Sequence, residues 1–455
     1  MAHPARGVDP GTDLGLDPGA ELGLDPGADP RRVWTNEDAT GSVDGRGMIQ
    51  DRQGDAAMSG KQRTLIFGAA AGVVIALACG QAAMDDGASA STGQGVEAPM
   101  FEVDPFWPKP LPDHWVLGSA IGVGVDSRDH VFIIHRGNLT ERTEGGADAD
   151  PPIGECCRAA PPVLEFDPDG NLVNAWGGPS DGYVWPASNH GITVDHMDNL
   201  WIGGNGQSDS HILKFSRDGD FLASYGEPEV GEEPDSNSET RFNRVAKLAF
   251  DAAANEAYLA DGYGGRRVAV LDASTGEFKR YWGAYGNAPD DTRTPPYDPD
   301  APLIQQFRTP VHCAEPSLDG LVYVCDRPND RIQVFQTDGT YVDEVQIAPR
   351  TLGDGSTWDI AFSRDADQQY MYVADGKNMR VYIMDRASLE ILTSFGDGGR
   401  QPGQFFAVHS IATDSNGNIY TTETYEGKRV QKFVYMGMGP VPAEHQGPPW
   451  PRGDQ

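Results

Sequence analysis

The sequence has few basic residues for its length. Only 35 lysine and arginine residues stand against 68 aspartate and glutamate residues in 455 positions, which gives a formal net charge of -33. This surplus of negative charge repels phosphate backbones and anionic lipid headgroups alike. We therefore expect no nucleic-acid partner, and membrane contact only through an anchor.

Long hydrophobic runs are also missing, apart from one near the amino terminus. Leu65–Ala78 is an apolar run of 14 residues that follows Lys61 and Arg63 and ends in "ALAC" at Cys79. This run is too short to span a membrane comfortably and is typical of a signal peptide. Its end resembles the lipobox of bacterial lipoproteins, although Ala76 stands where leucine is commonest. A simple secretory signal or an uncleaved anchor is the alternative.

The segments around this run contain little that can form a core. Residues 1–57 include the near-duplicate "LGLDPGAELGLDPGADP" and are predicted to be a disordered extension, or to precede a true start at Met58. Residues 58–79 are the predicted signal peptide, and residues 80–100 a flexible tether. We expect an exported monomer that is lipid-anchored to the cell envelope at Cys79, or secreted.

Cysteine is scarce, with five residues in the chain. Without Cys79, four remain for an oxidising compartment. Cys313 and Cys325 flank "AEPSLDGLVYV", and a hairpin between them would place them opposite one another, which predicts a cross-strand disulfide. Cys156 and Cys157 are adjacent, and a bridge between neighbouring Cα atoms about 3.8 Å apart is strained. Free thiols and a redox-labile vicinal pair are both open.

No long amphipathic helical pattern is present, whereas 56 glycines and 34 prolines favour many short strands joined by turns. From about residue 101 the chain repeats one unit, which is an apolar strand, a polar turn, a second strand, a basic-aromatic strand and a turn into a fourth. One copy is "HGITVDHMDNLWIGGNGQSDSHILKFSRDGDFLASYG", residues 190–226. The first strands of the six copies contain, at one shared offset, Ile121, His190, Ala246, His312, Trp358 and His409.

The sixth copy stops before its fourth strand, and the strand-like "MFEVDPFWP" before the first copy can supply it. Pairing the two ends of the chain in this way closes a ring of sheets and removes their free edges. We therefore predict an all-β, six-bladed β-propeller over residues 101–436. A tail rich in proline and glycine follows over residues 437–455. The repeated units resemble NHL repeats.

A histidine recurs at the head of the first strand in alternate blades. His190, His312 and His409 each lie five residues before the turn that ends that strand, in blades 2, 4 and 6. Because the first strand of each blade lines the central channel, these side chains should converge about 120° apart at one depth. A lone histidine is more often a surface or hydrogen-bonded residue. Three at one offset favour a catalytic zinc site, which commonly has three protein ligands.

Two further residues follow the second strands of blades 1 and 3. Arg136 stands in "IIHRG" and Tyr263 in "ADGYGG", whereas blades 5 and 6 have "ADGKN" and "TETYE", so the repeat does not demand either residue. A guanidinium can hold a carboxylate in a bidentate pair, and a phenol beside a cation and a metal can act as a base. Each residue alone suits a surface or packing role, but together with the histidines they are candidate catalytic residues.

These five residues lie in short motifs: "IHRG" at Arg136, "NHGI" at His190, "DGYGG" at Tyr263, "PVHC" at His312 and "AVHS" at His409. In sequence and order the motifs resemble those of the peptidyl-α-hydroxyglycine α-amidating lyases. The resemblance implies a propeller with zinc on the three histidines. It implies cleavage of the C–N bond of a carbinolamide to an amide and glyoxylate, with Tyr263 taking the hydroxyl proton. Arg136 would hold Tyr263 in its anionic form or clamp the substrate carboxylate.

The chain departs from that family at several positions. Gly264 replaces a cysteine, so one family disulfide is absent, and Ala407 replaces a methionine. The family binds a structural calcium partly through an aspartate at the position of Ser410, which leaves backbone carbonyls near Val123 and Ile192 as donors for Ca²⁺. No copper hydroxylase domain precedes the propeller, so a hydroxylated peptide would have to come from elsewhere.

Two other functions use the same channel. A hydrolase would use a zinc-activated water against a lactone or ester, and a non-enzymatic NHL scaffold would bind a peptide or carbohydrate on one face. Structural zinc sites usually have four protein ligands, whereas this channel offers three. That difference favours an open catalytic site for a small-molecule or peptide substrate.

Overall fold

The computed structural model describes residues 95–228 and 235–451. The predicted extension, signal peptide and lipid anchor, and most of the predicted tether, lie outside these ranges. Within the two ranges, no helix has the length and apolar character needed to span a bilayer.

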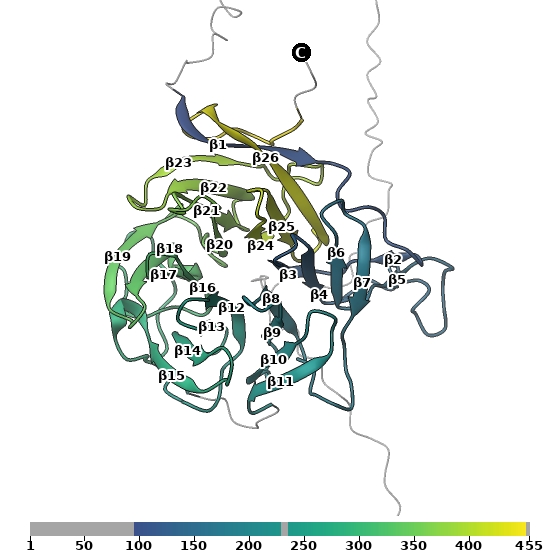
Figure 1. The fold of residues 1–455 in the computed structure, drawn as a ribbon, viewed down its shortest axis with the longest axis horizontal. Coiled ribbons are helices and arrows are strands. Elements are labelled where there is room, and N and C mark those ends of the chain that lie inside the picture. Colours follow the sequence, from purple (N-terminus) through teal and green to yellow (C-terminus); the bar gives the residue numbers. More distant parts are fainter. Residues whose placement is uncertain (1–94, 229–234, 452–455) are drawn as a thin grey trace, which may run out of the picture. The chain divides into compact units, whose positions relative to one another are not determined.

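The described chain forms six four-stranded antiparallel sheets arranged as blades around a central channel (Figure 1). Blade 1 consists of β3 (Ala120–Val125), β4 (Val131–His135), β6 (Val163–Phe166) and β7 (Leu172–Trp176). Blade 2 consists of β8 (Asn189–Val194), β9 (Leu200–Gly204), β10 (His211–Phe215) and β11 (Phe221–Gly226). Blade 3 consists of β12 (Val245–Asp251), β13 (Glu256–Asp261), β14 (Arg267–Asp272) and β15 (Phe278–Trp282).

The second half of the ring follows the same order from the channel outward. Blade 4 consists of β16 (Val311–Pro316), β17 (Leu321–Asp326), β18 (Arg331–Gln336) and β19 (Tyr341–Gln346). Blade 5 consists of β20 (Asp359–Phe362), β21 (Tyr370–Asp375), β22 (Arg380–Asp385) and β23 (Ile391–Phe395). Blade 6 consists of β24 (Val408–Thr413), β25 (Ile419–Glu423), β26 (Arg429–Val441) and β1 (Val96–Asp104). The predicted all-β, six-bladed propeller is confirmed.

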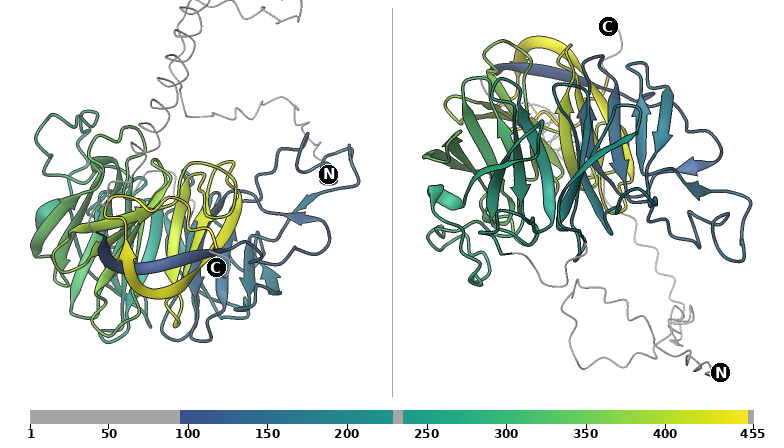
Figure 2. Two further views of the ribbon diagram at one scale, coloured as in Figure 1. Left: turned by 90° about the horizontal axis from the view of Figure 1, so that it is seen from above. Right: turned by 60° about the horizontal axis from the view of Figure 1, so that its bottom comes forward.

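The ring closes where β1 pairs with β26, as predicted, and the two strands lie side by side in both views of Figure 2. Phe101 anchors β1, because its ring is 5% exposed and packs against Phe395 and Tyr435 at 5.7 and 5.9 Å between centroids. Both strands extend past the predicted boundaries of 101 and 436. A register shift between Pro99 and Phe101 lets the pairing continue to Val96 and Val441.

The segment after β26, predicted to be a tail, hydrogen-bonds to the blades. The amide of Gly396 donates to the carbonyl of Gly447 at 3.0 Å, and the amide of Val103 donates to the carbonyl of Pro449 at 2.7 Å. Its prolines cannot donate to a strand ladder, but their carbonyls still accept hydrogen bonds. Residues 442–451 therefore cover the seam between blades 5 and 6.

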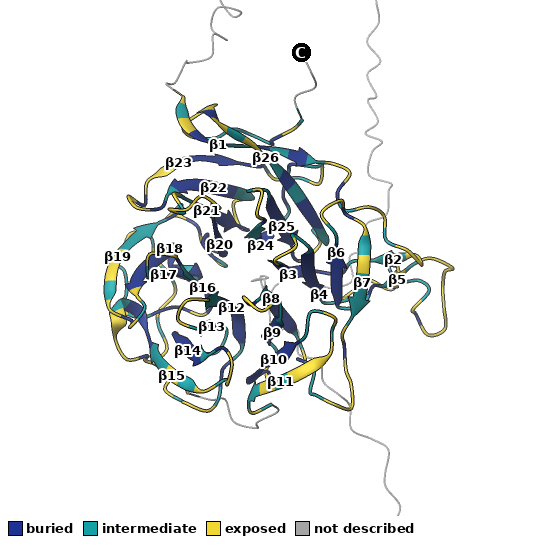
Figure 3. Ribbon diagram, viewed as in Figure 1, coloured by how far each residue is buried: buried dark blue, intermediate teal, exposed yellow. Residues whose placement is uncertain are grey.

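Burial decreases from the channel to the rim, as Figure 3 shows. Every residue of β13 is buried, whereas every residue of the outer strand β11 is exposed or only partly buried. Strands that are covered on both faces need apolar side chains on both, which explains their nearly continuous hydrophobic runs. The core therefore lies between neighbouring blades.

Two disulfides brace the described chain. The predicted bridge joins Cys313 in β16 to Cys325 in β17, which are directly opposite in the ladder with Cα atoms 4.8 Å apart. Cys156 and Cys157 also form a disulfide, in the long insertion between β4 and β6. That insertion contains β5 (Arg158–Ala159), which pairs with β2 (Trp115–Val116). The vicinal pair, open from sequence, is thus a disulfide.

Candidate metal centre

A bulge directs each of the three histidines into the channel. The pairing of first and second strands shifts register at His312 and at His409, between their flanking residues, and in blade 2 the shift spans both His190 and Gly191. A bulged residue is left out of the ladder, and its side chain is re-aimed by the local bend. In blade 2 the next residue must be glycine, because a Cβ on Gly191 would lie 2.5 Å from the carbonyl oxygen of Ala246.

The three imidazoles converge as predicted. Their rings are 4.8 to 5.3 Å apart between centroids, and one ligating nitrogen from each lies within 4.8 Å of the others. All three are buried, at 1% exposure for His190, 3% for His312 and 4% for His409. The structure therefore brings together, from blades 2, 4 and 6, the residues that the repeat offset singled out.

The carbonyl of the equivalent residue in the following blade faces the Nδ1 atom of each histidine. His190 Nδ1 donates to the Ala246 carbonyl at 2.7 Å, and His312 Nδ1 donates to the Trp358 carbonyl. For His409 the neighbour is the Ile121 backbone, although its Nδ1 makes no hydrogen bond of regular geometry in the described chain. A carbonyl can only accept, so in His190 and His312 Nδ1 carries the proton and Nε2 presents its lone pair.

Burial keeps these imidazoles neutral. It lowers the pKa of all three histidines well below the ordinary value, and the charges of Arg136 and Arg327 lower the pKa of His190 and His409 further. For His312, burial is followed by the charge of Arg327 and by the other two histidines. Neutral imidazoles with fixed tautomers are the form that binds a metal ion. The donor set therefore fits zinc.

Tyr263 completes this cluster. Its hydroxyl oxygen lies 2.9 Å from His190 Nε2 and 3.2 Å from His312 Nε2, so the phenol bridges the two ligating nitrogens. Gly262 permits this approach, because a Cβ there would lie 1.9 Å from the Val311 carbonyl oxygen of β16. The predicted tyrosine and histidines thus share one site.

Arg136 lies at the same site but does not touch Tyr263 by a hydrogen bond in the described structure. Its Nε donates to the Asn189 carbonyl at 3.2 Å, and its Nη2 donates to Asn205 Oδ1 at 2.8 Å. Burial lowers the pKa of Arg136, while the Tyr263 oxygen raises it through charge. The charge of Asp209 also raises it, whereas both hydrogen-bond acceptors of the guanidinium are neutral.

Arg327 is a site residue that the sequence interpretation missed. It begins the short 3₁₀ turn η3 (Arg327–Asn329), is 6% exposed, and its Nη1 lies 3.4 Å from the Tyr263 hydroxyl. Its guanidinium also covers the Trp358 ring at 4.6 Å. The signal was available, because Arg327 follows the second strand of blade 4 as Arg136 follows that of blade 1.

The residues next to the histidines do not fit calcium. Lys247 Nζ lies 2.7 Å from Asp359 Oδ1 and 2.7 Å from Glu315 Oε1, and Ser410 Oγ donates to Asp359 Oδ2 at 2.6 Å. Lys247, Asp359 and Ser410 each stand one residue past the shared offset, and Glu315 stands three residues past His312. We call these four residues the ammonium cluster. Its carboxylates already surround a cation, so these side chains offer no place for calcium. The backbone carbonyls near Val123 and Ile192 stay a prediction.

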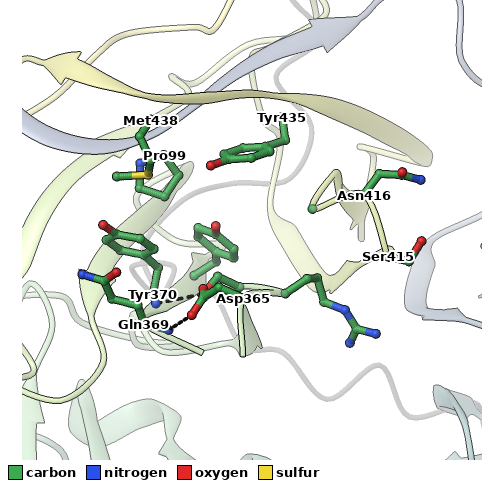
Figure 4. Close-up of a pocket in the computed structure, with 12 residues that line it drawn as sticks. Pro99, Asp365, Gln369, Tyr370, Ser415, Asn416, Tyr435 and Met438 are labelled. Atoms are coloured by element: carbon green, nitrogen blue, oxygen red, sulfur yellow. Dashed lines mark hydrogen bonds between the residues drawn. The ribbon is translucent and has the colours of Figure 1, made fainter. Parts of the chain in front are cut away.

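Two other features of the described chain do not belong to this centre. Asp126, His130 and Glu165 also approach one another, but Arg217 already binds that cluster through Asp126 and Glu165. A cavity of about 300 Å³ lies between blades 5 and 6 (Figure 4). None of the three channel histidines lines it. Its wall includes Tyr370, Tyr372 and Tyr435.

Comparison with known proteins gives distant similarities. No family model matches the chain. Mouse (Mus musculus) NHL repeat-containing protein 3 is 25% identical over 357 residues, which cover 74% of this chain and 85% of that protein. Peptidyl-alpha-hydroxyglycine alpha-amidating lyase 1 of Drosophila melanogaster is 24% identical over 354 residues, covering 71% of this chain and 58% of that protein.

A solved streptogramin B lyase aligns with a TM-score of 0.43 at 10% identity, covering 75% of this chain and 98% of that one. This structural likeness is too weak to support an argument about function. The sequence relatives show that the chain is distantly similar both to a protein named only for its NHL repeats and to amidating lyases. The chain matches little more than half of the length of the Drosophila lyase.

Proposed function

We propose that this protein is a zinc-dependent lyase that cleaves the C–N bond of an N-acyl-α-hydroxyglycine, giving an amide and glyoxylate. The observation that carries the proposal is the hydroxyl of Tyr263, which lies within hydrogen-bonding distance of two of three converging histidines. His190, His312 and His409 would hold the metal. Bound zinc supplies a Lewis acid that makes a hydroxyl group more acidic.

The charge of the site supports an anionic substrate. Arg136 donates to neutral acceptors, and the nearest ion pair of Arg327 is with Asp354 at 3.9 Å. The buried Nε of Arg327 has no hydrogen-bond partner among the described residues. By contrast, buried Arg267 pairs with a carboxylate at 2.8 Å. Two guanidinium groups without a close carboxylate can bind the carboxylate of a hydroxyglycine.

The reaction balances with the groups present. Tyr263, as a phenolate, takes the proton of the substrate hydroxyl, and that carbon forms a C=O bond as its bond to nitrogen breaks. The nitrogen leaves with the bonding electron pair and receives a proton, and the phenol of Tyr263 is positioned to return it. Arg136 and Arg327 bring positive charge to the phenolic oxygen and the substrate carboxylate. No redox cofactor is needed.

Glyoxylate release from an N-acyl-α-hydroxyglycine by the zinc-loaded full chain tests the proposal. We expect turnover, about one zinc per chain, and loss of both in His409→Ala. The matched control is His211→Asn, because His211 is equally buried in blade 2 but hydrogen-bonds to the Val184 carbonyl outside the centre. It should keep zinc and activity.

The outcomes separate the alternatives. Bound zinc with lactone or ester hydrolysis but no glyoxylate would favour the hydrolase. If His409→Ala leaves the zinc content unchanged, the three histidines do not form the metal site. That result would favour a non-enzymatic binding scaffold, and the mouse relative is named only for its NHL repeats.

A further inference from the structure

The ammonium cluster joins four blades inside the channel, next to the histidines. We call this part of the channel the channel floor. Lys247 comes from blade 3, Glu315 from blade 4, Asp359 from blade 5 and Ser410 from blade 6. Asp359 also accepts from the backbone amides of Ile360 at 2.9 Å and Ile411 at 3.0 Å. Its two oxygens therefore receive four donors in all, and the carboxylate is held in one orientation.

The cluster has one lysine against two acids, of which Asp359 is buried and Glu315 is partly buried. Lys247 is 9% exposed and Asp359 1% exposed. Burial opposes the charge of Lys247, but Asp359 and Glu315 outweigh it and raise its pKa, so the ammonium persists. A buried carboxylate pair without a cation would be strongly destabilising. Burial raises the pKa of Glu315 to about 7 even though Lys247 lowers it, so a cation between the two acids favours their ionised forms.

We propose that the Lys247 ammonium is the resident cation of the channel floor, and that its removal uncovers a latent calcium site formed by Glu315, Asp359 and Ser410. Two carboxylates and a hydroxyl from different strands are the hard oxygen ligands that Ca²⁺ prefers. A lysine supplies positive charge at the same point through a covalent tether. The native propeller accordingly needs no divalent ion there.

The backbone connects the ammonium cluster to the three histidines. Lys247 follows Ala246, whose carbonyl accepts from His190, and Asp359 follows Trp358, whose carbonyl accepts from His312. Ser410 directly follows His409. The ion contacts thus fix the backbone at the points that orient the imidazoles. This inference concerns assembly of the channel and does not depend on the reaction.

Thermal unfolding of the zinc-loaded full chain, with and without millimolar CaCl₂, tests the inference. We expect no calcium effect on wild-type Tm. Lys247→Ala should lower Tm by roughly 5 °C and recover most of it with calcium. Lys247→Met should lose as much but not recover, because its side chain fills the space. Lys247→Ala with Glu315→Gln should also not recover.

Either of two results would overturn the inference. One is a rise of wild-type Tm with calcium that Glu315→Gln abolishes, which would mean that the ion displaces Lys247. The other is a folded Lys247→Ala variant that neither binds nor responds to calcium. If that variant folds only with CaCl₂ present, calcium-dependent refolding is the supporting readout. Zinc content and glyoxylate release, measured in parallel, report on the proposed function separately.

Discussion

Replacement of Tyr263 by phenylalanine tests the chemistry of the centre most directly. The change removes one oxygen and keeps the ring, which lies 4.8 Å from the His190 ring and 5.7 Å from the His312 ring. The lost hydrogen bond is worth about 1 kcal/mol of folding free energy. The fold and the imidazole positions should therefore survive, and zinc should remain bound.

The effect on turnover should be much larger than the effect on stability. A positioned general base contributes about 10²- to 10⁴-fold to a rate, which corresponds to about 3–5 kcal/mol of transition-state stabilisation. We expect Tyr263→Phe to lower kcat by this factor while zinc per chain and KM change little. Steady-state glyoxylate release and metal analysis on the same preparation measure both quantities.

A second tyrosine serves as the control for loss of a phenolic hydroxyl elsewhere in the propeller. The hydroxyl of Tyr183 also makes a hydrogen bond, to the Gly178 carbonyl at 3.2 Å, but its ring packs against Phe221 of the outer strand β11, away from the histidines. Tyr183→Phe should leave kcat close to the wild-type value, because it removes a hydroxyl that contacts no residue of the centre. If Tyr263→Phe kept wild-type kcat with zinc bound, the phenol would not be the base. If it lost zinc, the hydroxyl would instead hold the metal centre together.

Three further substitutions test the framework around the centre. Phe101→Ala should cost about 3–5 kcal/mol of unfolding free energy by emptying the seam that closes the ring, measured by chemical denaturation. Replacing Cys313 and Cys325 together by serine should cost about 3 kcal/mol, and a reductant should then have no further effect at this bridge. Burial raises the pKa of Asp330 to about 7, so the folded state binds its proton more tightly and stability falls as pH rises toward 8. Asp330→Asn should remove about 2–3 kcal/mol of that fall between pH 5 and pH 8, and an unchanged pH profile would contradict the assignment.

The sequence was sufficient for the fold and the histidines because both depend on the repeat. The shared offset of His190, His312 and His409 survives the insertion in blade 1, since each blade is a separate sheet built on one pattern. The boundaries of the propeller were not predictable to the residue. Pro99 interrupts the apparent strand, and only its partner strand, which runs to Val441, shows that pairing continues beyond it.

The sequence was less informative about side chains whose partners lie in another blade. Arg327 was missed because a charged residue before proline reads as an exposed turn, whereas here it lies against Trp358 and Tyr263. Lys247 and Asp359 stand 112 positions apart, and each alone looks like a polar residue in a half-buried strand. A charged residue inside an apolar first strand was the available signal, but its partner could not be identified without the blade order.

Alternation around the ring explains why three blades carry histidine and three do not. The shared offset in blades 1, 3 and 5 holds Ile121, Ala246 and Trp358, and the backbone at each of these residues faces the histidine of the preceding blade. Six imidazoles at this depth would crowd the axis. With three, His190 and His312 each donate from Nδ1 to such a carbonyl, which leaves Nε2 free to bind a metal ion. The apolar residues at the odd positions are therefore part of the centre, since their backbone sets the tautomer on which metal binding depends.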